Sequence, residues 1–156
     1  MPASPQRGFG TKPSVSDEPE APRELLCLRC EAEVILDVVF DSGLLFLVVA
    51  NTGDRPAHNV RIRFGEPFSG VGGAKRIDRL SLFRKLQFLA PQKSIPVFLD
   101  RSAAYFARDE PTRLSAAIVW RTSAGERRTS TVHHDLEIYR DLGFIDREVP
   151  HRAGPA

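Results

Sequence analysis

The chain has 156 residues and a formal net charge of +2, from 22 basic and 20 acidic side chains. This length suits one domain plus a tail, and the 42% hydrophobic content supplies a core that needs no disulfide bonds. The near balance of charge, without a basic block, argues against a nucleic-acid partner, and no apolar run approaches the roughly 20 residues of a membrane span.

The first 24 residues differ from the rest of the chain in composition. They contain five of the 12 prolines, and Phe9 and Val15 are their only large apolar side chains after the initial methionine. Such a segment buries too little apolar surface to offset its ordering entropy. We therefore expect residues 1–24 to form a disordered, proline-rich arm.

Apolar side chains become frequent near Glu24, and this change in composition marks a domain boundary. We expect the domain to cover residues 25–145 and a flexible tail to cover residues 146–156. The start of the chain lacks the basic head and apolar stretch of a secretory signal peptide, so we expect a cytoplasmic location.

Cys27 and Cys30 lie at the beginning of the expected domain. Zinc needs about four ligands, and the sequence has no second Cys-x-x-Cys pair to complete a site. A thioredoxin-like pair opens a helix that follows a strand, whereas this pair precedes the first predicted strand. We interpret the two cysteines as reduced thiols, and a metal or small-ligand site at Cys27 and Cys30 remains the alternative function.

A strand with period-two alternation of apolar residues is predicted from Glu31 onward. The turn-forming residues 41–43 then predict a hairpin, because two strands joined by so short a connection must be antiparallel. The next run, residues 44–50, is apolar at almost every position. This run predicts a central strand that is covered on both faces.

The clearest alternation follows the turn at residues 51–56 and places Arg61 and Arg63 on the wet face of a half-buried strand. The glycine-rich segment 65–75 lacks the spacing of a phosphate-binding loop and is predicted to be an exposed, mobile loop. Mobile loops often carry partner contacts. The candidate partner-binding residues are Arg61, Arg63, Gly70, Gly72 and Gly73.

The second half of the chain predicts further short elements. Residues 78–89 fit one helical turn followed by a short strand, and residues 102–109 fit a helical turn. The last two strands form a predicted hairpin, and the returning strand, rich in threonine and arginine, is typical of an edge. The inward face of the first strand of this hairpin consists of Leu114, Ala116, Ile118 and Trp120. After the returning strand, Leu136, Ile138 and Tyr139 are expected to close the domain.

The run His133-His134-Asp135 is the main candidate for catalysis or metal binding in this half of the chain. Alternation along a strand leaves only His133 and Asp135 on one face, and two ligands do not make a metal site. No nucleophile or third group accompanies them. We expect the protein not to be an enzyme and to carry no cofactor.

Two stretches of the sequence resemble the bacterial and archaeal immunoglobulin-like domains of the CARDB type. Residues 48–62 contain their strand, Asn-x-Gly turn and Ala-x-Asn-Val pattern, and residues 89–95 resemble their Leu-x-Pro-Gly-x-Ser turn, with Gln92 where glycine is usual. The resemblance covers roughly residues 31–138. It implies adhesion, spacing or partner binding in larger assemblies, without an active site.

The predicted fold is therefore all-β, an immunoglobulin-like antiparallel β-sandwich of about seven strands. The expected function is a non-catalytic protein-binding or scaffolding module, an accessory subunit of a larger assembly. A protein partner is expected, with neither nucleic acid nor a membrane span involved.

Overall fold

The structure is a computed structural model that describes residues 31–144 and, before them, only the isolated residues 3, 8 and 10. The predictions for the arm, for Cys27 and Cys30, and for the tail over residues 146–156 lie outside the described residues.

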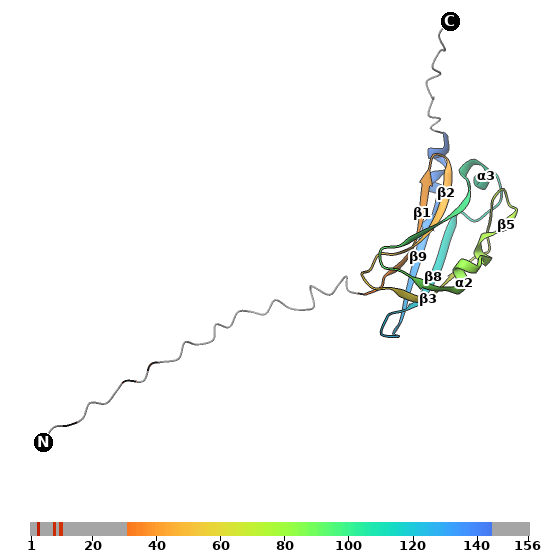
Figure 1. The fold of residues 1–156 in the computed structure, drawn as a ribbon. Coiled ribbons are helices and arrows are strands. Elements are labelled where there is room, and N and C mark those ends of the chain that lie inside the picture. Colours follow the sequence, from red (N-terminus) through yellow and green to blue (C-terminus); the bar gives the residue numbers. More distant parts are fainter. Residues whose placement is uncertain (1–2, 4–7, 9, 11–30, 145–156) are drawn as a thin grey trace, which may run out of the picture.

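Two antiparallel sheets build the domain, as the sequence predicts (Figure 1). The three-stranded sheet has the order β1-β2-β7, and the four-stranded sheet has the order β6-β3-β8-β9. Their strands are β1 (Val34–Asp41), β2 (Leu44–Asn51), β3 (Ala57–Phe64), β6 (Leu86–Leu89), β7 (Ser94–Arg101), β8 (Arg113–Arg121) and β9 (Arg127–Asp135). The predicted all-β sandwich of about seven strands is confirmed.

Short elements connect these strands. The chain between β3 and β6 forms a small hairpin and a helical turn, which confirms the helix-then-strand prediction for residues 78–89. A further helical turn follows β7, also as predicted. The short elements are β4 (Ser69–Gly70), β5 (Lys75–Arg76), η1 (Ile77–Arg79), α2 (Ser81–Lys85), α3 (Ser102–Phe106), η2 (Leu136–Tyr139) and η3 (Asp141–Phe144).

The hairpin between β1 and β2 shows how local sequence determines the register. Ser42 and Gly43 are the two residues of the turn, and both have positive φ angles, of 50° and 81°. This is the conformation of a type I′ turn, whose twist matches that of the flanking strands. The turn pairs Asp41 with Leu44 and directs alternate residues of both strands into the core.

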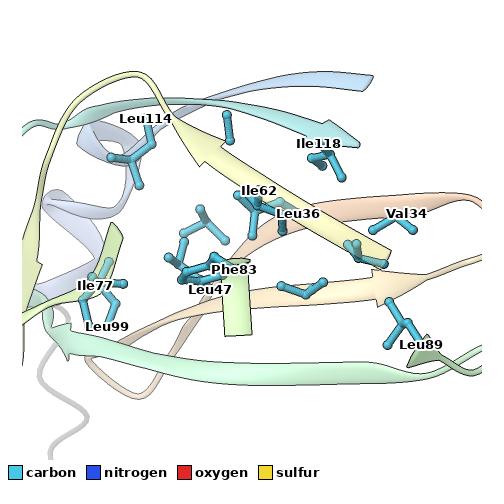
Figure 2. Close-up of a cluster of buried hydrophobic side chains, with 14 of the residues drawn as sticks. Val34, Leu36, Leu47, Ile62, Ile77, Phe83, Leu89, Leu99, Leu114 and Ile118 are labelled. Carbon is cyan, nitrogen blue, oxygen red and sulfur yellow. The ribbon is translucent and has the colours of Figure 1, made fainter. Parts of the chain in front are cut away.

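The core lies between the two sheets (Figure 2). The predicted inward face of β8 is confirmed, because Leu114, Ala116, Ile118 and Trp120 are all buried. β1 and β2 contribute from the opposite sheet, and Phe83 of α2 fills one side of the cluster. The three-stranded sheet contributes Val34, Leu36, Val38, Leu45, Leu47, Val49 and Leu99 to the core.

Two predictions about coverage are wrong. Phe46 and Val48 of β2 are only half-buried, because β2 is central within its sheet but the described chain covers only one face of that sheet. Ile138 does not close the domain, since its side chain is 65% exposed. Its neighbours Leu136 and Tyr139 do pack against the core, as predicted.

Side chains of the four-stranded sheet and of η2 cover the outer edge of β1. The Trp120 indole donates to the Ala32 carbonyl at 3.2 Å, and the Tyr139 hydroxyl donates to the Val38 carbonyl at 3.2 Å. Between them, His134 Nε2 lies 2.7 Å from the Leu36 carbonyl oxygen. These contacts satisfy edge carbonyls that would otherwise be open to another strand.

Candidate functional site

Four arginines from three strands lie close together on one part of the outer face of the four-stranded sheet. The strand β3 has a bulge where the register with β8 shifts between His58 and Arg61, and Asn59 there has a φ of 50°. After the bulge Arg61 and Arg63 point outward, as the sequence predicts. Arg121 of β8 and Arg127 of β9 are paired in register beside them. The four residues Arg61, Arg63, Arg121 and Arg127 are called the arginine face below.

The arginine face borders a hollow of about 580 Å³. Small and apolar side chains of β8, Ala117 and Val119, form part of its lining, and the described residues that line it include no carboxylate. Among the ion pairs between described residues, none involves a member of the arginine face. Guanidinium groups bind carboxylate and phosphate oxygens through paired hydrogen bonds, so the hollow is chemically suited to an anion.

A second hollow of about 460 Å³ continues beside Arg61 and Arg63 and adds Arg84 of α2. The carboxylate in its lining belongs to Asp78, which already binds Arg76 at 2.9 Å. The hydrogen bond from Arg76 lowers the pKa of the Asp78 carboxyl. The negative charge of Asp78 is therefore balanced by Arg76. The positive character of the surface therefore extends from β9 to α2.

The outer face of the three-stranded sheet is apolar. Its central row runs across all three strands, from Val39 through Phe46 to Phe98, and the two phenyl rings meet edge to face with centroids 5.7 Å apart. Val39 is 38% and Phe98 is 39% exposed. The apolar face, as it is called below, consists of Ile35, Val39, Leu44, Phe46, Val48, Pro96 and Phe98.

The glycine-rich segment is an anchored hairpin rather than the mobile loop that the sequence predicts. Gly70 is buried, and a Cβ atom there would lie 2.1 Å from the Leu99 carbonyl oxygen, so only glycine fits. The Val71 amide donates to the same carbonyl at 2.8 Å. Gly70 is therefore a structural residue, whereas Gly72 and Gly73 remain at the surface with positive φ angles of 67° and 86°.

A buried ion pair holds this hairpin against β7. Asp100 accepts from the Gly72 amide at 3.1 Å and from the Arg108 guanidinium at 2.6 Å. Arg108 also donates to the backbone carbonyls of Ala104 and Ser69. Burial raises the pKa of the adjacent Tyr105 phenol, whose hydroxyl donates to a backbone carbonyl at 2.7 Å. The Arg108 Nε atom has no hydrogen-bond partner among the described residues and lies 3.7 Å from a Glu110 carboxylate oxygen, so two carboxylates share this guanidinium.

The run His133-His134-Asp135 is divided between the two faces of β9. His133 and Asp135 are exposed on one face of β9, and His134 turns inward to the edge of β1, as alternation predicts. Across residues 31–144, no three His, Cys, Asp or Glu side chains are grouped closely enough to hold a metal ion. No helix among the described residues has the length and apolar character to cross a membrane.

The sequence indicated only part of the two faces. Alternation placed Arg61 and Arg63 on one face, but whether Arg121 and Arg127 lie beside them depends on strand pairings that connect distant segments. The apolar face was visible as the unbroken apolar run in β2, but its exposure depends on what covers the sheet.

The comparisons with known proteins concern the same domain. Residues 28–140 match the family model of DUF8453, described as a domain of unknown function. No curated protein matches the chain. The matched range contains all the strands that build the two faces, from Val34 of β1 to Asp135 of β9. Because the match spans most of the chain, this protein belongs to the DUF8453 family.

Proposed function

We propose that this domain is a non-catalytic protein-binding module, an accessory or scaffolding subunit whose protein partner packs on the apolar face. The observation that carries the proposal is that β2 is apolar on both sides while the described chain covers only one of them. A strand with this composition is typical of a sheet that is buried on both faces.

The composition of the apolar face supports a protein occupant. Each Å² of apolar surface removed from water contributes about 25 cal/mol, so side chains such as Phe46 and Phe98 favour association strongly once they are covered. Exposed apolar patches of contiguous side chains mark interaction sites on soluble proteins. Aromatic residues at the centre of a patch are the usual energetic hot spots of an interface.

Charge around the apolar face indicates what kind of protein fits. Asp37 and Asp41 of β1 are exposed on the same side of the sheet, and with Arg101 of β7, which pairs with Leu44, they leave this side with an excess of negative charge. A partner with an apolar surface flanked by lysine or arginine complements them. A second copy of this chain would instead bring four carboxylates and two Arg101 guanidinium groups into one interface, an excess of negative charge that is unfavourable. We therefore assign the face to a different protein.

The fold is compatible with this role. The chain forms two strands of the three-stranded sheet, crosses to the other sheet for β3 and β6, returns for β7, and crosses again for β8 and β9. This alternation between sheets is that of immunoglobulin-like sandwiches, and we propose that the domain is one of them. Such domains bind partners through sheet faces, edges and loops without needing an active site.

A charge placed in the apolar face tests the proposal. The variant Phe98→Glu is expected to weaken partner binding at least about 30-fold, because truncating or charging a central hot spot costs about 2 kcal/mol or more. The partner is first identified by crosslinking and mass spectrometry in the native organism. Its purified form is then titrated against the full chain by calorimetry.

The matched control is Phe88→Glu, since Phe88 is 55% exposed but lies on β6 in the other sheet. This variant should bind like the unmodified protein. Thermal melting of both variants checks that the fold is retained. Equal loss of binding in the two variants would contradict the proposal. So would a homodimer that Phe98→Glu dissociates, because the occupant would then be a second copy.

A further inference from the structure

We infer that the arginine face is a docking site for an acidic polypeptide segment, and that residues 17–24 of this same chain are its occupant. The site lies on the opposite sheet from the apolar face and does not depend on the function proposed above. It is a separate interaction surface, whose guanidinium groups would bind the carboxylates of the segment.

The charge pattern of the sequence provides the first argument. All acidic residues of the first 30 positions, Asp17, Glu18, Glu20 and Glu24, lie within residues 17–24, where the basic residue is Arg23. The hollow at the arginine face presents four guanidinium groups, and the described residues that line it provide no carboxylate. Charge clusters of opposite sign therefore occur at two places in one chain of almost neutral net charge.

The point at which the described chain begins provides the second argument. Glu31 is ion-paired with Arg128 at 2.8 Å, so the segment before it starts beside β9. Arg127, a member of the arginine face, is the preceding residue of that strand, and its side chain lies on the opposite face of the sheet, so the segment has to pass around the β9 edge to reach it. Six residues lie between Glu24 and Glu31, so the two are seven residue steps apart, a reach of about 25 Å when extended. The arginine face spans the two strand spacings from β9 to β3, about 10 Å.

The short connection between residues 17–24 and the domain also explains how exposed charges hold this acidic segment. A single exposed ion pair contributes less than about 1 kcal/mol, so docking needs several pairs acting together. A short tether keeps the segment at an effective concentration on the order of millimolar at the site. The contact should therefore form at low salt and be lost near 1 M salt, where screening extends over only about 3 Å.

Polypeptide suits the hollow better than nucleic acid. Binding of single strands combines basic side chains with exposed aromatic rings on which bases stack. The aromatic residue in the lining is Trp120, and its ring is buried and donates to the Ala32 carbonyl. The hollow itself therefore offers charge without a stacking platform.

Competition with a peptide tests the inference. A fluorescent peptide with the sequence of residues 14–26 is titrated into the full chain and into the arm-neutralised chain Asp17→Asn, Glu18→Gln, Glu20→Gln, Glu24→Gln, with fluorescence polarisation as the readout. The neutralised chain should bind the peptide about tenfold more tightly at low salt, because its own segment no longer competes. In the neutralised chain, Arg61→Glu with Arg63→Glu should abolish binding.

The charge-matched control in the same background is Lys93→Glu with Arg113→Glu, two exposed residues that do not line the hollow. It should retain binding within about twofold, as expected if local contacts rather than net charge determine affinity. Equal peptide affinity for the unmodified and neutralised chains would overturn the inference. Tighter binding of an oligothymidylate of equal charge would also overturn it, in favour of nucleic acid. A dimer that dissociates on neutralisation would overturn docking within one chain.

Discussion

Asp100→Ala should lower the free energy of unfolding by about 2–3 kcal/mol, the usual cost of leaving charge-assisted hydrogen-bond donors without their acceptor. The Asp100 side chain is 4% exposed and accepts from Arg108 at 2.6 Å and from the Gly72 amide. Without the carboxylate, the Gly72 amide loses its acceptor, and Arg108 keeps only the Ala104 and Ser69 carbonyls and the more distant Glu110 carboxylate. Urea unfolding followed by circular dichroism measures the change.

The control for this variant is Asp135→Ala, which removes a carboxylate 4.0 Å from Arg113 at the exposed end of β9. Exposed pairs of this kind contribute about 0–1 kcal/mol, so the control should unfold almost like the unmodified protein. If Asp100→Ala cost no more than Asp135→Ala, the ion pair would not anchor the β4–β5 hairpin as described.

Phe83→Ala should destabilise the domain by about 3–5 kcal/mol, the range for removing a buried phenyl group and leaving a cavity. Phe83 is 1% exposed, and its ring meets that of Phe64 edge to face with centroids 5.0 Å apart. Because α2 has only five residues, it has little helical stability of its own and depends on this contact. Detachment of α2 would also disturb the hollow that Arg84 lines.

Phe88→Ala is the matched control, because Phe88 is exposed on the neighbouring strand β6. Its loss should change stability by less than about 0.5 kcal/mol, as for most surface substitutions. A similar effect of the two substitutions in differential scanning calorimetry would show that Phe83 does not hold α2 to the core.

Local patterns predicted β1, β3 and β8 well because each of these strands has one buried face. The alternation in β1, β3 and β8 is a direct consequence of the pleat, and the turn at Ser42 and Gly43 needs only the residues that form it. The prediction for β2 failed on one face because a run of apolar residues indicates that both faces avoid water, without indicating what covers them.

Contacts between distant segments could not be predicted in the same way. The Asp100 carboxylate meets the Gly72 amide 28 residues away, and His134 meets the edge of β1 98 residues away. The arginine face depends on the pairing of β3 with β8 and of β8 with β9, and a bulge at Asn59 shifts the first of these registers. Such placements follow from topology, which residue types alone do not determine.

Hydroxyl-radical footprinting inside cells of the native organism tests the central claim most directly, since it reports which side chains are covered in the working assembly. The account predicts that Phe46 and Phe98 are oxidised several-fold less in cells than in the purified protein, because a partner excludes water from the apolar face. Phe88, on the other sheet, should be oxidised equally in both. Equal oxidation of Phe98 in cells and in the purified protein would contradict a partner on the apolar face.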